Sequence, residues 1–125
     1  MIRAKHLLIL SLLLVFPVSA FGQQTSGVTG VVTDATGALI NGADVTLTDT
    51  KTNKELSTKT NEQGVYYFNK VSPGIGYRIT FSAQGFDTMM LNNVTLGVGV
   101  TETQNAQLTV GQVTNTVTVT SSGEA

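Results

Sequence analysis

Apolar and polar residues alternate with a period of two over most of the chain after residue 27. The clearest case is the set Ala43, Val45 and Leu47, which shares one face of an extended segment while polar residues take the other face. Similar alternation predicts strands over residues 28–33, 55–60, 65–69, 77–81, 89–95 and 101–110. No segment repeats its apolar residues at the helical period of 3.6. The pattern therefore predicts an all-β fold, a seven-stranded sandwich of two sheets.

Residues 61–74 organise this prediction, because they read as a turn, a strand and a second turn. Asn61 and Gly64 bracket the first turn, since both tolerate a positive φ. Pro73 ends the strand. The large apolar side chains of this strand and the next lie two residues apart, so they share a face. The predicted core is Tyr66, Phe68, Tyr77, Ile79 and Phe81.

The first twenty residues differ from the rest. Arg3 and Lys5 precede an almost wholly apolar run over residues 7–16, and small residues follow. This layout is typical of a secretory signal peptide, with cleavage expected between Ala20 and Phe21 or, as the alternative, after Gly22. A membrane anchor is the other interpretation, but the apolar run is shorter than the roughly 20 residues that span a bilayer. We therefore expect an exported protein, located in the periplasm, at the periplasmic side of the outer membrane or at the cell surface.

Charge and cysteine content narrow the class of protein further. Charged residues make up 12% of the chain and the formal net charge is −1, so no nucleic-acid partner is indicated. There is no cysteine, and the exported domain must be held together by its core without disulfides. The expected organisation is a signal peptide (1–20), a flexible lead-in (21–26), one sandwich domain (27–110) and a Val/Thr-rich exit strand or linker (111–125).

Side chains suited to catalysis are scarce. The only histidine, His6, lies in the predicted signal peptide, so no His-dependent triad, cysteine nucleophile or zinc site is expected in the mature chain. The carboxylates are scattered, and we predict no catalytic residue, metal or cofactor. Asp34 and Glu62 lie in predicted turns, where calcium binding is a weaker alternative to turn formation.

Tyr67 is the candidate ligand-facing aromatic residue. It lies between two inward-facing residues, so its ring should point to the outer face of the sheet. An exposed ring there could stack on a sugar or pack against a partner. The alternative is a ring covered by neighbouring side chains.

Several segments, taken in order, resemble the carboxypeptidase regulatory-like domain. The matching segments are residues 30–34, 40–47, 60–68, 71–74 and 85–86, with Gly37 and Tyr77. The resemblance covers about residues 27–108, and it implies a transthyretin-like sandwich of the broad carbohydrate-binding-like class. One departure is the pair Ile75 and Gly76, which is expected to lengthen a turn without changing the strand register.

In this family the domain is a non-catalytic accessory, and it often precedes the plug and barrel of a TonB-dependent outer-membrane transporter. A predicted signal peptide, this domain and a Val/Thr-rich exit segment are similar to that arrangement. The resemblance implies a downstream plug and barrel, or another outer-membrane protein, as partner. The alternatives are a carbohydrate-binding module and a stand-alone structural protein of the periplasm or cell surface.

The exit segment resembles a TonB box, the extended peptide by which such transporters are engaged. Its candidate docking residues are Thr116, Val117, Thr118 and Val119. An alternating Val/Thr segment can add to the edge of a partner's sheet through backbone hydrogen bonds. The other interpretations are a further strand of the chain's own sandwich and a plain linker.

Overall fold

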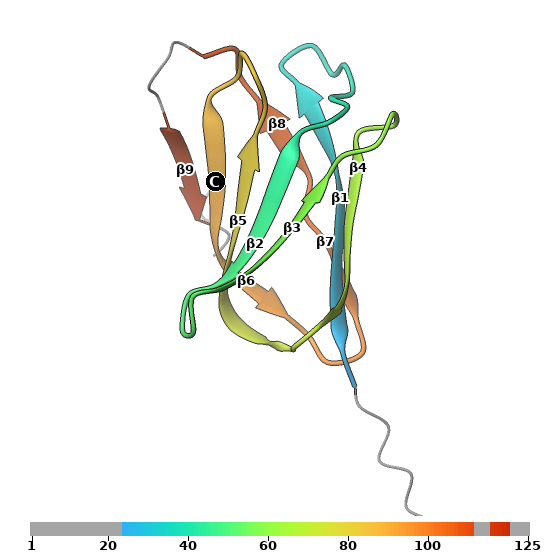
Figure 1. Ribbon diagram of the computed structural model, residues 1–125, viewed down its shortest axis with the longest axis vertical. Coiled ribbons are helices and arrows are strands. Elements are labelled where there is room, and N and C mark those ends of the chain that lie inside the picture. Colours follow the sequence, from blue (N-terminus) through green and yellow to red (C-terminus); the bar gives the residue numbers. More distant parts are fainter. Residues whose placement is uncertain (1–23, 112–115, 121–125) are drawn as a thin grey trace, which may run out of the picture.

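The computed structural model describes residues 24–111 and 116–120, which form two stacked β-sheets (Figure 1). None of these residues forms a helix, so they include no helical membrane span. The predicted signal peptide and its cleavage site at Ala20 and Phe21 lie outside the described residues. The strands are β1 (Ser26–Asp34), β2 (Asp44–Asp49), β3 (Lys54–Lys59), β4 (Val65–Val71), β5 (Gly74–Ser82), β6 (Thr88–Leu96), β7 (Thr101–Thr103), β8 (Ala106–Leu108) and β9 (Thr116–Thr120).

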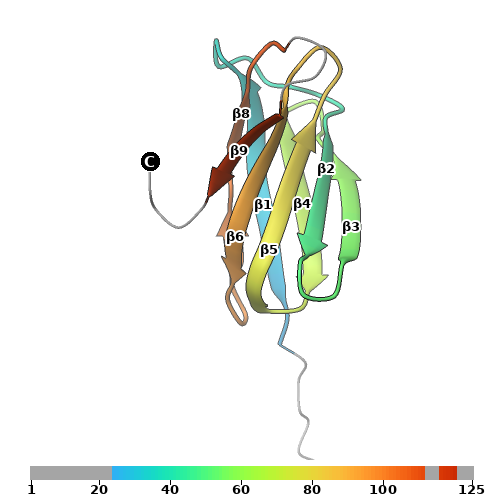
Figure 2. The same cartoon turned by 90° about the vertical axis from the view of Figure 1, so that its left-hand side faces the viewer.

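The larger sheet has the strand order β3-β2-β5-β6-β9, and the smaller sheet is β4-β1-β7 with β8 also paired to β1. Most neighbours are antiparallel, whereas β7 and β8 run parallel to β1, and β9 runs parallel to β6. Figure 2 shows the larger sheet in front of β1 and β4. This arrangement confirms the predicted all-β sandwich of two sheets.

The core lies between the sheets and contains the five residues that the alternation predicted. Tyr66 and Phe81 are 1% and 0% exposed, and Phe68, Tyr77 and Ile79 are also buried. The ring of Tyr66 packs edge-on against Phe68 at a centroid distance of 6.0 Å and against Phe81 at 5.5 Å. Tyr66 of β4 and Phe81 of β5 belong to different sheets, so this contact joins the two layers.

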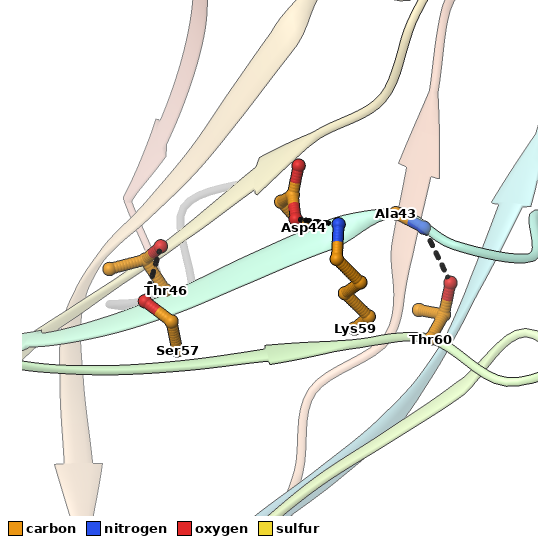
Figure 3. A network of polar contacts seen from close by, with 6 residues as sticks. All are labelled: Ala43, Asp44, Thr46, Ser57, Lys59 and Thr60. Carbon is orange, nitrogen blue, oxygen red and sulfur yellow. Dashed lines mark hydrogen bonds and ion pairs between the residues drawn. The ribbon is translucent and has the colours of Figure 1, made fainter.

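The β2–β3 hairpin shows why alternation specifies this fold. Leu47 pairs with Leu56 on the inner face, while Thr46 pairs with Ser57 on the outer face. The outer face carries polar contacts: the Nζ atom of Lys59 lies 2.6 Å from Oδ1 of Asp44 (Figure 3). Both side chains are well exposed, so this ion pair contributes little to stability.

Two predicted turns form as their sequences indicate. The backbone N–H of Gly64 donates to the carbonyl of Asn61 at 2.9 Å, and Gly64 has a φ of 71°. The Asn61 side chain also accepts from the backbone of Val65 at 3.0 Å. In the other turn, the N–H of Gly37 donates to the carbonyl of Asp34 at 3.1 Å. The Asp34 side chain also accepts from the backbone N–H of Thr36 at 2.8 Å. Both turns therefore use a side-chain acceptor and a glycine to reverse the chain.

Two details of the prediction need correction. Residues 75 and 76 do not merely lengthen a turn, because β5 begins at Gly74 and its pairing with β6 shifts register between Gly74 and Tyr77. A bulge inside the strand absorbs the extra residues, and Gly76 supplies a positive φ of 80°. The predicted strand over residues 101–110 is split into β7 and β8 at residues 104–105. With this split and the addition of β9, the described residues contain nine strands where seven were predicted.

Candidate functional site

Tyr67 is exposed on the outer face of the smaller sheet. Its neighbours Tyr66 and Phe68 point into the core, and 52% of Tyr67 remains accessible. The alternative that neighbouring side chains cover this ring does not hold. The sequence therefore places the ring on the correct face, and the structure adds what surrounds it.

A groove of about 270 Å³ lies beside this ring, and we call it the Tyr67 groove. Asn69 and Lys70 of β4 line it together with Tyr67, and Val100 and Thr101 line it from the β6–β7 connection and β7. Gly27 lies between these two sides, because its strand β1 is paired with β4 on one edge and with β7 on the other. A Cβ on Gly27 would lie 3.2 Å from the Thr101 hydroxyl oxygen. The absence of a side chain at this position keeps the groove open.

Backbone contacts fix the far side of the groove. The N–H of Gly27 donates to the carbonyl of Val100 at 3.2 Å, and the Ser26 hydroxyl donates to the same carbonyl at 3.0 Å. The N–H of Gly99 donates to the carbonyl of Thr25 at 3.0 Å. Among the described residues, no acidic side chain lines the groove. The site offers a ring for stacking beside neutral donors and acceptors and the Lys70 residue, which lines the inter-strand space on either side of β4, so its chemistry suits a polar, uncharged or anionic ligand.

Lys70 adopts an unusual backbone conformation, with a φ of +54°. The pairing of β1 with β4 is irregular here: Ser26 lies opposite Val71 and Val28 lies opposite Phe68, which leaves one extra residue on β4. A bulge of this kind redirects the strand and its side chains. A non-glycine residue in this region costs of order 1 kcal/mol, so the surrounding pairing must hold Lys70 in place.

The two acidic turn residues differ in their surroundings. The Asp34 carboxylate accepts hydrogen bonds from the Thr36 hydroxyl at 2.6 Å and from the backbone of Thr36 and Ala38. These bonds, the Thr36 hydroxyl first, hold the pKa of Asp34 below its usual value of 3.8. Glu62 is exposed. No group of three or more metal-ligating side chains occurs among residues 24–111 and 116–120, and turn formation explains the position of the Asp34 carboxylate.

The candidate docking residues Thr116, Val117, Thr118 and Val119 lie in β9. This strand pairs in parallel with β6, with Val117 opposite Met89 and Val119 opposite Leu91. It ends the larger sheet, opposite the β3 edge, as Figures 1 and 2 both show. The segment therefore takes the position that the interpretation as a further strand predicted. Its docking role stays a prediction.

The link between β7 and β8 is a feature that alternation could not reveal. The carbonyl of Gln104 accepts a hydrogen bond from the Tyr66 hydroxyl at 2.5 Å, and the Asn105 side chain accepts from the N–H of Val31 at 2.9 Å. Gly30 lies directly beneath this link. An isolated glycine inside a strand pattern signals a close backbone approach, and it was the available hint.

Comparison with known proteins assigns the domain. Residues 27–109 match the model of the carboxypeptidase regulatory-like domain, which is well over half of the chain. The chain belongs to the carboxypeptidase regulatory-like domain family. The resemblance drawn from the turn and strand motifs is thereby confirmed. No curated protein sequence matches the chain.

Solved structures share the fold of this carboxypeptidase regulatory-like domain at low sequence identity. A Bacteroides uniformis protein proposed to bind carbohydrate has a TM-score of 0.56 and 15% identity, covering 69% of this chain and 42% of that one. Hydroxyquinol 1,2-dioxygenase from Pseudomonas putida has a TM-score of 0.57 and 8% identity, and the match covers 74% of this chain and 59% of the dioxygenase chain. The group B streptococcus pilus 2b backbone protein has a TM-score of 0.51 and 14% identity, and the match covers 70% of this chain and 42% of the pilus protein. The chain spans less than two thirds of each of these proteins, and the likeness shows the fold alone.

Proposed function

We propose that this chain is an exported, non-catalytic accessory module that precedes the plug and barrel of a TonB-dependent outer-membrane transporter. The family is of the regulatory or binding type, which agrees with such a role. The observation that carries the proposal is the position of β9, because a Val/Thr segment after the sandwich lies at the edge of the larger sheet. The signal-peptide pattern of residues 1–20 supports export.

The edge position of β9 makes docking physically reasonable. One side of β9 pairs with β6, and no strand among residues 24–111 covers its other side. The sequence Thr116–Thr120 contains no charge and no proline, which are the usual devices that keep an edge strand from pairing with another chain. A partner strand can add to the uncovered side, or it can replace β6 as the neighbour of β9.

The absence of catalysis is part of the same proposal. The chain after residue 6 contains neither histidine nor cysteine, so acyl transfer by a His-activated nucleophile has no base. Among the described residues the acidic side chains are not gathered into a cluster that could hold a metal. The mature domain then acts through binding.

Amide hydrogen exchange tests the docking role. β9 pairs with β6 only at the edge of the larger sheet, where local opening is easier than in the centre. We therefore expect the Val117 and Val119 amides to be less protected than those of the central strands in the isolated chain, and to exchange at least tenfold more slowly when a TonB C-terminal domain is added. The Val45 amide of the central strand β2 is the internal control, and its exchange should not change. Strong protection of Val117 and Val119 in the isolated chain would exclude a free docking strand, and exchange unaffected by TonB would exclude docking.

A pair of proline variants sharpens this test. Val117→Pro removes a backbone donor from β9 and should abolish the effect of TonB. Val98→Pro places the same residue in the exposed β6–β7 connection and should leave the effect intact. Equal behaviour of the two variants would contradict strand addition at β9.

Carbohydrate binding is the second candidate, and the exposed ring of Tyr67 in its groove favours it. Saccharide rings present an apolar face that stacks on an aromatic side chain, and the neighbouring Asn69 and Thr101 can hydrogen-bond hydroxyl groups. A single aromatic residue is a weak platform, so we expect affinities no tighter than about 1 mM.

Titration with polysaccharides separates the two candidates. Saturable binding that Tyr67→Ala weakens and Leu39→Ala preserves would support the groove as a sugar site, since Leu39 is equally exposed elsewhere. Micromolar affinity for any glycan would rank carbohydrate binding first. Failure to bind any glycan at about 10 mM would remove this candidate and leave the docking proposal untouched.

A further inference from the structure

A hollow of about 130 Å³ opens between the two sheets, where β2 and β3 of the larger sheet face the end of β4. We call it the inter-sheet hollow. Its apolar wall includes the buried residues Leu47 and Val71. Leu56 also lines it and lies on the inner face of the sheet, opposite Leu47, yet it is 39% exposed. An inward-facing leucine with this exposure shows that the side chains of residues 24–111 do not fill the space at this edge.

Strand register gives the hollow a charged mouth. Asp49 lies opposite Lys54 on β3 and opposite Tyr77 on β5, so these three residues form one inward-facing row next to the leucine row. The Tyr77 hydroxyl donates to the carbonyl of Ser72 at 2.6 Å, which ties the β4–β5 turn to this row. Burial first, and then the Asp49 charge, raises the pKa of Tyr77, so the phenol stays a protonated donor. The hydrogen bond to Ser72 holds the Tyr77 side chain at the wall of the hollow.

The charges around the mouth favour an anion. Lys54 and Lys70 both line the hollow, against the single carboxylate of Asp49. That carboxylate already accepts a hydrogen bond from the backbone of Lys51 at 3.0 Å. Lys70 reaches this position from the β4 bulge, in the left-handed conformation described above. Two lysine residues beside an apolar wall are matched by a ligand with an apolar body and one negative charge.

We propose that the inter-sheet hollow binds a small carboxylic acid with an apolar body of about six to nine carbon atoms, of the phenylpropanoate class. The body packs against Leu47, Leu56 and Val71, and the carboxylate lies at the mouth near Lys54 and Lys70. The volume of about 130 Å³ is close to the roughly 150 Å³ of an apolar cavity that accommodates benzene, so a single ring fills the hollow and the rest of the ligand extends out of its mouth. This site is separate from β9, and its ligand does not depend on the transporter proposal.

NMR titration of the full chain with 3-phenylpropanoate tests the proposal. We expect saturable shifts of the amides around the hollow, with a Kd of about 1 mM for a ligand of this size. The uncharged amide 3-phenylpropanamide has the same shape and should bind about fivefold more weakly, because it lacks the charge that the lysines attract. Absence of saturable shifts up to about 20 mM would overturn the proposal, and equal binding of acid and amide would overturn the role of the lysines.

Two tryptophan variants locate the site. Leu56→Trp should fill the hollow and weaken binding at least tenfold. Leu39→Trp is the matched control, because Leu39 is a 52% exposed leucine that does not line the hollow, and binding should not change. Lys54→Gln, at an exposed position, should weaken binding of the acid and leave binding of the amide unaffected. Equal binding by the two tryptophan variants would place the ligand elsewhere and refute the assignment.

Discussion

Replacing Gly30 by alanine tests the close approach of the β7–β8 link to β1. Gly30 does not have a positive φ, so the substitution introduces no backbone strain of that kind. The added Cβ would overlap the carbonyl oxygen of Gln104 and would lie 2.8 Å from Cε1 of Tyr66. Real Cβ atoms essentially never approach other heavy atoms below 3.0 Å, so the link must move away from β1.

The size of the effect follows from three terms. Overpacking a well-packed site costs about 1–3 kcal/mol. Moving the link would also break the hydrogen bond from the Tyr66 hydroxyl to Gln104, which is worth about 1 kcal/mol. The gain from a less flexible unfolded chain is about 0.4–1 kcal/mol. We therefore expect Gly30→Ala to lower the free energy of unfolding by about 2 kcal/mol.

Urea denaturation followed by circular dichroism measures this change. Gly97→Ala is the matched control, because a Cβ there meets nothing closer than 3.7 Å and the φ is not positive; it should be neutral or slightly stabilising. If Gly30→Ala already breaks the hydrogen bond of the Tyr66 hydroxyl, Tyr66→Phe should cost less in the Gly30→Ala background than it does in the wild type. A Gly30→Ala protein as stable as Gly97→Ala would refute the described path of residues 104–105.

Three further predictions follow from burial and pKa. Phe68→Ala should cost about 3–5 kcal/mol in denaturant melts and Tyr67→Ala clearly less, and equal losses would contradict their opposite facing. Burial raises the pKa of Tyr66 above 10.0, so above pH 10 the phenol loses its proton more readily in the unfolded chain and the free energy of unfolding falls. The urea midpoint of Tyr66→Phe should therefore fall less than that of the wild type as the pH rises above 10, and equal decreases would contradict this assignment. Thr36→Ala should raise the Asp34 pKa towards 3.8 in an NMR titration, and an unchanged pKa would contradict the hydroxyl contact.

Much of the candidate site was accessible from the sequence, but its surroundings were not. The alternation of Tyr66, Tyr67 and Phe68 determines which ring faces outward, because side chains of a strand alternate between faces. The groove beside Tyr67 also needs Val100 and Thr101, which are more than thirty residues away along the chain. No local pattern predicts which distant segment will lie beside a given strand, so the groove required the structure.

The sequence by itself determined the family, the two-sheet class, the turns and the core, because period-two alternation and turn chemistry act over a few residues. Tertiary structure decided the parts that depend on how strands meet. It split the last predicted strand over Gly30 and placed an extra residue in the β5 bulge. It also left Leu56 partly uncovered above the inter-sheet hollow. The physical reason is that strand pairing and packing between sheets are long-range contacts, and local patterns do not encode which ones form.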